Sequence, residues 1–171
     1  MSLISFVLPI YNEEGNIGRL WEELSNLQTK IDPKYQTEFI FINDGSTDQS
    51  LEMLINLHKE NSKKVSVIDF SRNYGHQIAV TAGQDMAHGD AIIIMDTDLQ
   101  DPPLVCLGLI KKWEEGFDIV YAQRRKYKTS FLKEVSAFVF YRLMSKIANV
   151  EIPVDTGDFR LLSRQIGRAH V

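Results

Sequence analysis

The sequence predicts an α/β fold in which a mainly parallel central sheet carries helices on both of its faces. Short apolar runs, which are typical of buried strands, alternate along the chain with stretches of helical periodicity. Strands that alternate with helices in this way form parallel sheets through crossover connections. The 171 residues suffice for one domain with a sizeable core, which we expect at 1–165.

The first predicted strand, 4–10, is followed by a predicted helix. Asn12 has the side chain of a helix N-cap, and Glu13 and Glu14 would then lie in the first turn, where acidic groups complement the helix dipole. Leucines and Trp21 recur at helical spacing after this point. We therefore expect a helix that begins directly after Asn12.

The second and third predicted strands are 39–42 and 65–70. Ser46 and Gln49 have the spacing of a capping box, so we expect the helix between these strands to open at Ser46. A polar loop after the third strand leads into a helix rich in small residues.

The remaining predicted elements are a fourth strand at 91–95, a helix at 104–113, a fifth strand at 119–122 and an amphipathic helix at 131–147. Cys106 lies in the second of these and is expected to be a buried thiol. As the single cysteine, it excludes an internal disulfide and a cysteine-rich zinc site, and it suits a reducing compartment.

The net charge and the hydropathy of the sequence limit the classes of protein to which the chain can belong. The formal net charge of −4 argues against nucleic-acid binding. We find no signal peptide and no run of about 18 apolar residues that would predict a transmembrane helix. The chain stops soon after 159–162, and residues 166–171 match one translated frame of a common sequencing adapter. We therefore expect a truncated domain with an artificial tail at 166–171.

Polar clusters follow the predicted strands, where open α/β sheets bind their ligands. These clusters are 9–13, 44–46, 72–73, 96–98 and Arg124 with Arg125. Together they predict a large ligand site at one edge of the sheet.

The carboxylates of Asp96 and Asp98 are the most informative group. Side chains two residues apart in an extended chain point the same way, and like charges that converge need a cation or a proton between them. Mg²⁺ or Mn²⁺ binds such carboxylates together with substrate phosphates, and Gln100 could add an oxygen ligand. The competing interpretation is that these loop carboxylates cap the following helix.

Two other acidic residues have equally ordinary explanations. Asp44 could bind a ribose hydroxyl or a base edge, but Asx-Gly-Ser before a helix is also a common turn. Glu13 could simply complement a helix dipole. The sequence contains no phosphate-binding P-loop, no dinucleotide fingerprint and no serine-hydrolase elbow, and its histidines lack metal-ligand spacing.

Several motifs in order carry a resemblance to a known family. They are Pro9-Ile10-Tyr11-Asn12-Glu13, Asn43-Asp44-Gly45-Ser46-Thr47-Asp48, Ser71-Arg72-Asn73-Tyr74-Gly75-His76-Gln77, Asp96-Thr97-Asp98-Leu99-Gln100-Asp101-Pro102-Pro103 and Gly157-Asp158-Phe159-Arg160-Leu161. Together they resemble the GT-A domain of family-2 glycosyltransferases, over about residues 3–165. The most similar branch contains the polyprenyl-phosphate enzymes, namely bactoprenol glucosyltransferases and dolichol-phosphate mannosyltransferases.

The resemblance implies a role for each matched position. Donor binding falls to Pro9, Tyr11, Asn12, Glu13, Asp44, Gly45, Ser46, Arg72, Asn73, Asp96 and Thr97. Asp96, Asp98 and Gln100 would hold Mg²⁺ or Mn²⁺ with the diphosphate, and Asp98 and Asp158 would be the catalytic pair, Asp158 matching the family's proposed base. Arg124 and Arg160 would contact phosphate oxygens. Tyr127 departs from the pattern, because relatives often carry a second arginine there.

The implied reaction is a metal-dependent, inverting transfer of a sugar from a UDP-sugar, or a GDP-sugar, to a polyprenyl-phosphate lipid, as in the modification of cell-wall or O-antigen glycans. The basic, aromatic helix at 131–147 is expected to lie in a lipid interface, although packing on the sheet is the alternative. Relatives add two C-terminal transmembrane helices, so we expect this domain at the cytoplasmic face of the cell membrane. The sequence leaves room for a homo-oligomer.

Three other functions compete with this one. The first is transfer to a glycan or protein acceptor, and the second is a nucleotide-sugar-binding module without turnover. The third, a sugar nucleotidyltransferase, is disfavoured because the loop after the first strand is acidic and lacks the expected glycines and basic residues.

Overall fold

The computed structural model describes residues 2–123 and 156–167, and of the side chains at 123, 156–158 and 167 nothing is described. The strands are β1 (Ser2–Ile10), β2 (Tyr35–Asn43), β3 (Val65–Asp69), β4 (Ala91–Ile94), β5 (Ile119–Gln123) and β6 (Thr156–Ser163). The helices are α1 (Ile17–Lys30), α2 (Ser50–Glu60), α3 (His76–Met86), α4 (Cys106–Glu114), the short α6 (Arg164–Gly167) and the 3₁₀ turn η1 (Pro103–Val105). All predicted strands and helices within these residues are present.

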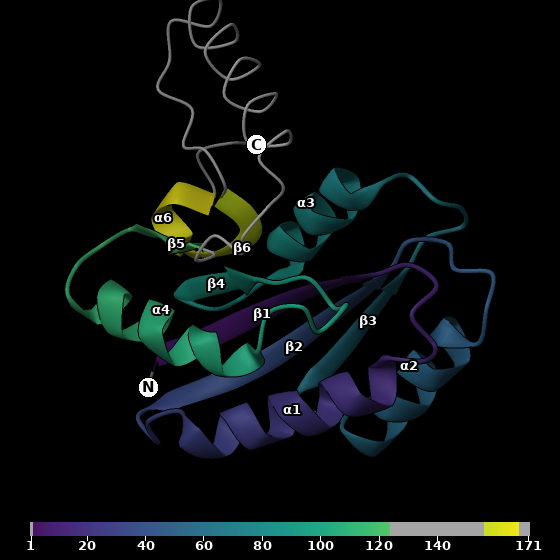
Figure 1. Cartoon of the computed structure of the whole chain (residues 1–171), viewed down its shortest axis with the longest axis horizontal. Coiled ribbons are helices and arrows are strands. Elements are labelled where there is room, and N and C mark those ends of the chain that lie inside the picture. The colour runs from purple at the N-terminus through teal and green to yellow at the C-terminus, as the bar shows by residue number, and fades with distance from the viewer. Residues whose placement is uncertain (1, 124–155, 168–171) are drawn as a thin grey trace, which may run out of the picture. The chain divides into compact units, whose positions relative to one another are not determined.

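The strands form a six-stranded sheet in the order β3-β2-β1-β4-β6-β5 (Figure 1). β1 pairs in parallel with β2 and β4, and β2 pairs in parallel with β3. The chain therefore moves outward from β1 in one direction and returns on its other side at β4. This reversal places a topological switch point between β1 and β4, where open α/β sheets bind ligands beyond the carboxyl ends of the strands.

Both faces of the sheet are covered, as the sequence predicts (Figure 1). On one face Phe6 stacks on its strand partner Phe39 with ring centroids 5.0 Å apart, and Trp21 of α1 meets Phe39 edge-on at 5.4 Å. The next residue of β1, Val7, points to the opposite face, where a Cβ at Gly83 of α3 would lie 2.4 Å from its Cγ1. α3 thus packs directly on the sheet, and its N-terminus is held close to the carboxyl edge.

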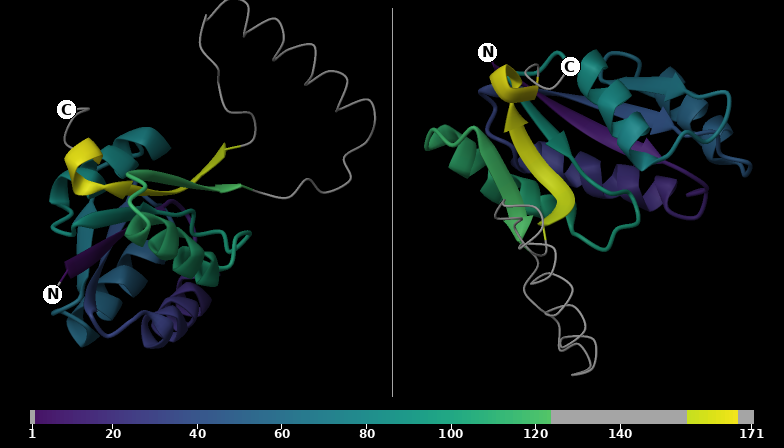
Figure 2. Two further views of the ribbon diagram at one scale, coloured as in Figure 1. Left: turned by 90° about the vertical axis from the view of Figure 1, so that its left-hand side faces the viewer. Right: turned by 90° about the horizontal axis from the view of Figure 1, so that it is seen from above.

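β6 is the one strand in the described residues that the sequence analysis did not predict, and the short α6 after it was not predicted either. It pairs antiparallel with β4 (Figure 2). In this pairing Arg160 lies opposite Ile94. Asp158, two residues before Arg160, therefore lies beyond the carboxyl end of β4. The antiparallel direction matters because it returns the start of β6 to the edge where the parallel strands end.

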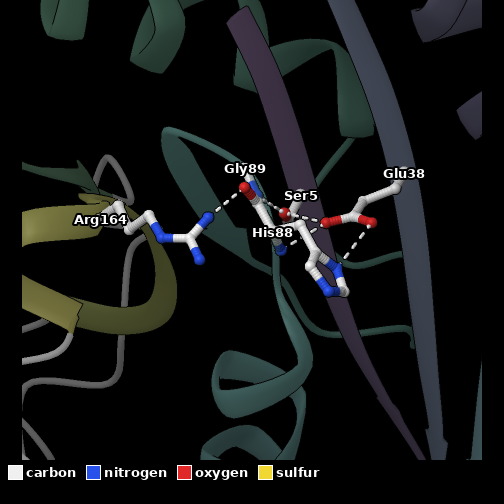
Figure 3. A network of polar contacts seen from close by, with 5 residues as sticks. All are labelled: Ser5, Glu38, His88, Gly89 and Arg164. Atoms are coloured by element: carbon white, nitrogen blue, oxygen red, sulfur yellow. Dashed lines mark hydrogen bonds and ion pairs between the residues drawn. The ribbon is translucent and has the colours of Figure 1, made fainter.

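A polar network links β1, β2 and the segment before β4 toward the amino ends of these strands (Figure 3). Ser5 Oγ donates to Glu38 Oε1 at 2.5 Å and accepts the Gly89 N–H at 2.8 Å. The same Glu38 oxygen accepts the His88 N–H at 2.7 Å, and the guanidinium of Arg164 donates to the His88 carbonyl. Because the network joins β1, β2 and the segment before β4, these polar residues stabilise the fold at the end of the sheet that lies away from the switch point.

Two predicted helix starts are wrong. α1 begins at Ile17, four residues after the expected start, and no acidic residue lies in its first turn. α2 begins at Ser50, so Ser46 is not its cap; the N-cap residue is Gln49, whose side chain makes no capping bond, and Asp48 Oδ1 accepts the Ser50 N–H at 3.0 Å. In both cases tertiary contacts between loops take up the polar side chains that would otherwise cap a helix.

Three further expectations concern Cys106, membrane-spanning helices and the residues after 123. Cys106 is fully buried, as predicted, and its burial raises the pKa of the thiol. Among residues 2–123 and 156–167, no helix is both long and apolar enough to cross a membrane. The predicted helix at 131–147, Arg124, Arg125 and Tyr127 lie outside the described residues, as do 168–171 of the expected artificial tail.

Contacts divide the chain into two compact units, 1–121 with 158–171, and 122–157. Apart from 122–123 at the end of β5 and 156–157 at the start of β6, the fold described above belongs to the first unit.

Candidate functional site

The loops after β1 and β4 are joined across the switch point. Thr97 is buried, and its Oγ1 donates to the carbonyl of Pro9 at 3.0 Å. Met95 adds a backbone bond, its N–H donating to the Val7 carbonyl at 3.2 Å. The first predicted donor-binding motif and the acidic motif therefore meet at one place.

The loop after β1 is also joined to the loop after β2. Asn12 has a positive φ of 55°, which is unlike the extended conformation of an N-cap. Its N–H donates to Ser46 Oγ at 3.0 Å, and its side-chain oxygen accepts the Thr47 N–H at 2.8 Å. The residues predicted to cap helices thus hold two loops together at the edge of the sheet.

Further bonds extend this junction. The Glu13 N–H donates to Ser50 Oγ at 2.9 Å, and the Glu14 N–H donates to the carboxylate of Asp48 at 3.1 Å. The carboxylate of Glu14 in turn accepts the Gln49 N–H at 2.8 Å. Tyr11, at the start of this junction, keeps 48% of its surface exposed and can offer a ring face to a ligand.

Asp44 is only 3% exposed, and both of its carboxylate oxygens accept backbone N–H groups. Oδ1 accepts from Tyr74 at 2.7 Å, and Oδ2 accepts from Gly75 at 3.0 Å. Asp44 therefore fixes the loop between β3 and α3, a role that neither sequence interpretation included. Because each carboxylate oxygen has two lone pairs, a contact to a nucleoside stays a prediction.

Gly45 allows the loop between β3 and α3 to lie close to the loop that follows β2. Its φ is 66°, and a Cβ there would lie 2.3 Å from the carbonyl carbon of Arg72 and 2.5 Å from the nitrogen of Asn73. The side chains of Arg72 and Asn73 are exposed, and the Arg72 guanidinium lies 4.7 Å from the ring centroid of Tyr74. Hydrogen bonds from Arg72 and Ser71 lower the pKa of the Tyr74 hydroxyl.

The acidic motif lies just past the end of β4. The Asp96 side chain is 35% exposed, and its Oδ1 lies 3.9 Å from Nε2 of His76. Asp98 is exposed, and its Oδ1 accepts the Gln100 N–H at 2.9 Å. Leu99 between them has a positive φ of 59°, an uncommon conformation for leucine that is often found at functional sites.

β4 ends at Ile94, so the alternation of an extended strand no longer governs 96–98. Convergence of Asp96 and Asp98 on one ion therefore stays a prediction.

β6 brings two more predicted residues to this edge. Asp158 lies near the start of β6, two residues before Arg160, which pairs with the last residue of β4, although of the Asp158 side chain nothing is described. Arg160 is half-buried, and within the described part of the chain its Nε is buried and has no hydrogen-bond partner. A buried guanidinium nitrogen in this position is suited to an anion.

Binding of Mg²⁺ or Mn²⁺ at the acidic motif stays a prediction, and the oxygens described there bear on it in two ways. Among the described residues, no group of three or more His, Cys, Asp or Glu side chains could enclose a metal ion. Mg²⁺, however, usually takes only one or two carboxylates from the protein and completes its shell with water and substrate phosphates. Asp96 and Asp98, with Gln100 beside them, supply such a partial set of oxygens.

Sequence reasoning missed His76. It lies inside one of the recognised motifs, yet no metal-ligand spacing or charge pattern gave it a role. Its place at the start of α3, directly after a loop that ends in glycine, was the available signal.

Comparison with known proteins identifies close relatives. Residues 5–169 match the family model described as Glycosyl transferase family 2. A Bacillus subtilis (strain 168) protein named uncharacterized glycosyltransferase YkcC is 48% identical over 163 residues, or 95% of this chain and 50% of that protein. The bactoprenol glucosyl transferase of Shigella phage SfV is 42% identical over 164 residues, or 95% and 52% respectively. The chain thus spans about half the length of the curated relatives it matches.

Solved structures share the fold. Glucosyl-3-phosphoglycerate synthase from Mycobacterium tuberculosis, in complex with UDP, has a TM-score of 0.68 at 22% identity, over 96% of this chain and 58% of that one. A second structure of that synthase, with a TM-score of 0.66, contains Mn²⁺, UDP and glucosyl-3-phosphoglycerate. TarS 1-349 from S. aureus, in complex with UDP, has a TM-score of 0.66 at 18% identity, over 99% and 49%. These likenesses confirm the predicted GT-A fold.

Proposed function

Because the chain belongs to glycosyl transferase family 2, we propose that its protein transfers a sugar from a nucleotide-diphosphate donor to a polyprenyl-phosphate lipid. Bactoprenol glucosyl transferases at 42% identity support the lipid acceptor. UDP in two fold neighbours supports a UDP-sugar over a GDP-sugar. The proposal concerns the activity of a whole protein, and the chain spans about half the length of those relatives.

One observation carries the donor half of the proposal. The Thr97–Pro9 hydrogen bond joins the acidic motif to the loop after β1 at the switch point of the sheet. A nucleoside against Tyr11 and Glu13 would therefore have its diphosphate within reach of Asp96 and Asp98. Arg72 and Asn73, exposed on the loop that Asp44 fixes, would contact the donor from the other side.

The reaction is one displacement at the anomeric carbon of the sugar. An oxygen of the acceptor phosphate forms a bond to that carbon, and the bond from the carbon to the donor's diphosphate breaks with inversion. The nucleoside diphosphate leaves with the electron pair. Mg²⁺ or Mn²⁺, when bound, would stabilise the charge that develops on this leaving group.

Asp158 has less to do in this scheme than a general base usually does. A phosphate monoester with a second pKa near about 6 is mostly ionised at neutral pH, so no proton needs to be removed. We propose that Asp158 orients the acceptor or offsets the charge of Arg160. Asp158→Asn should then retain far more activity than Asp98→Asn, and equal losses with a phosphate acceptor would contradict this role.

Arg124 and Arg160 would contact phosphate oxygens in this proposal. We also propose that residues 131–147 meet the lipid surface and that the protein works at the cytoplasmic face of the cell membrane. Liposome sedimentation with anionic lipid tests the membrane contact, which should weaken as salt is raised. Binding that does not respond to salt, or no binding, would count against it.

The decisive experiment separates binding from turnover. Thermal shift with UDP-glucose and GDP-mannose, with and without Mn²⁺, tests the donor site in the chain as it stands. Transfer of radiolabelled sugar to polyprenyl phosphate, measured by organic extraction, tests the reaction. Thermal stabilisation of the protein by a nucleotide sugar without transfer to any acceptor would favour a nucleotide-sugar-binding module. Transfer to a glycan or protein would show that the acceptor is not a lipid. No thermal stabilisation by any nucleotide sugar would contradict the proposal.

A further inference from the structure

His76 faces the acidic motif from a different element of the fold. It is the first residue of α3, and its Nε2 lies 3.9 Å from Oδ1 of Asp96, beyond the end of β4. Both side chains are about one third exposed, at 37% and 35%. The imidazole therefore lies next to the carboxylate of Asp96 in the candidate site, and no predicted role accounts for it.

The backbone around His76 is held on both sides. Immediately before it, the N–H groups of Tyr74 and Gly75 donate to the buried carboxylate of Asp44. Gly75 then turns into the helix with φ 96° and ψ 153°, a conformation that only glycine adopts readily. Immediately after it, Ala79 and Val80 are buried in the core that α3 shares with the sheet.

These contacts limit where the imidazole can go. Because the loop is tied to β2 through Asp44 and α3 packs on the sheet, the backbone of His76 is held in place, and the ring can move away from Asp96 only by changing its rotamer. At 3.9 Å the two groups are too far apart for a direct hydrogen bond, but they are within range of an electrostatic contact or a bridging water. Such a contact would restrict the rotamers of Asp96.

We propose that His76 is a positioning residue that orients the carboxylate of Asp96 for a divalent cation shared with the donor diphosphate. The inference rests on the proposed function. Partners of metal-binding carboxylates commonly set the orientation of those carboxylates, and their loss typically lowers metal affinity about 10–100-fold. His76 itself contacts neither the cation nor the sugar in this arrangement.

The test measures cation binding rather than turnover. The dissociation constant of Mn²⁺ is obtained from the electron paramagnetic resonance of free Mn²⁺, with and without UDP, for the wild type, His76→Ala and His76→Gln. Gln77→Ala is the matched control, because Gln77 is exposed on the same turn of α3. Thermal unfolding without ligands shows that each variant is folded.

We expect His76→Ala to raise the Mn²⁺ dissociation constant about 10–100-fold and to change metal-free UDP binding by less than about 2-fold. His76→Gln, which keeps an N–H donor, should recover most of the affinity, and Gln77→Ala should match the wild type. An unchanged Mn²⁺ affinity in His76→Ala would overturn the inference. So would an equal loss of metal-free UDP binding, which would assign His76 to the donor itself.

Failure of the proposed function would look different. If the wild type bound Mn²⁺ but no UDP and transferred no sugar, the function would be refuted, while the Mn²⁺ affinities of the His76 variants would still decide the positioning role.

Discussion

Gly45 is the position where we expect the addition of one methyl group to disturb the candidate site most. Its φ of 66° lies in the left-handed region, and an added Cβ would lie 2.3, 2.5 and 2.7 Å from three backbone atoms of Arg72 and Asn73. Backbone atoms cannot turn aside as a flexible side chain can. Gly45→Ala must therefore displace the loop that Asp44 holds.

The size of the effect follows from two contributions. The left-handed conformation costs a residue with a Cβ about 1–2 kcal/mol. Displacing Arg72 and Asn73 pulls on the N–H groups that donate to Asp44, and one hydrogen bond to a charged group is worth about 1.5–3 kcal/mol. We expect Gly45→Ala to lower the free energy of unfolding by about 2.5–5 kcal/mol. For a domain of this size the unfolding midpoint would fall by about 5–20 °C.

Two other glycines serve as controls in urea and thermal unfolding. Gly75 has a φ of 96° but open space around an added Cβ, so Gly75→Ala should show the conformational cost alone, about 1–3 kcal/mol. Gly18 is the second residue of α1 and has open space and no positive φ, so Gly18→Ala should not destabilise the protein and should stabilise it by at most about 0.5–1 kcal/mol. If Gly45→Ala cost no more than about 1–2 kcal/mol, the cost of the left-handed conformation alone, the close approach of the two loops would be refuted.

Three further predictions use single contacts. Thr97→Val should lower the free energy of unfolding by about 1–3 kcal/mol and weaken UDP binding, measured by calorimetry, because the buried Pro9 carbonyl loses its donor; undiminished UDP binding would separate this bond from the site. Ser5→Ala should destabilise by a similar amount, since the Gly89 N–H loses its acceptor, yet leave UDP affinity unchanged at the far edge of the sheet. Cys106, whose thiol pKa is raised by burial, should react with a thiol reagent only after unfolding, so rapid labelling of the folded protein would contradict its burial.

The order of strands and helices could be predicted from periodicity, because apolar runs and helical stripes are local properties of the chain. β1 to β5 were all predicted, and the parallel sheet with helices on both faces follows from their alternation. The start of α1 was not, because Asn12 and Ser46 bond to each other's loops rather than to their own helices. A capping pattern cannot be distinguished from such a loop junction until the loops are brought together.

Parts of the candidate site could likewise be predicted from the sequence, and other parts could not. That polar loops gather at one edge, and that Asp96 and Asp98 follow a central strand, could be inferred from the amino-acid sequence, since parallel strands end at a common edge.

Only the tertiary structure decided that both carboxylate oxygens of Asp44 accept hydrogen bonds from a neighbouring loop and that His76 faces Asp96. It also decided that β6 runs antiparallel to β4 and so returns Asp158 to the end of the sheet where the parallel strands end. These contacts join residues about 20 to 60 positions apart. No local pattern encodes them, because each depends on which strands pair and in which direction they run.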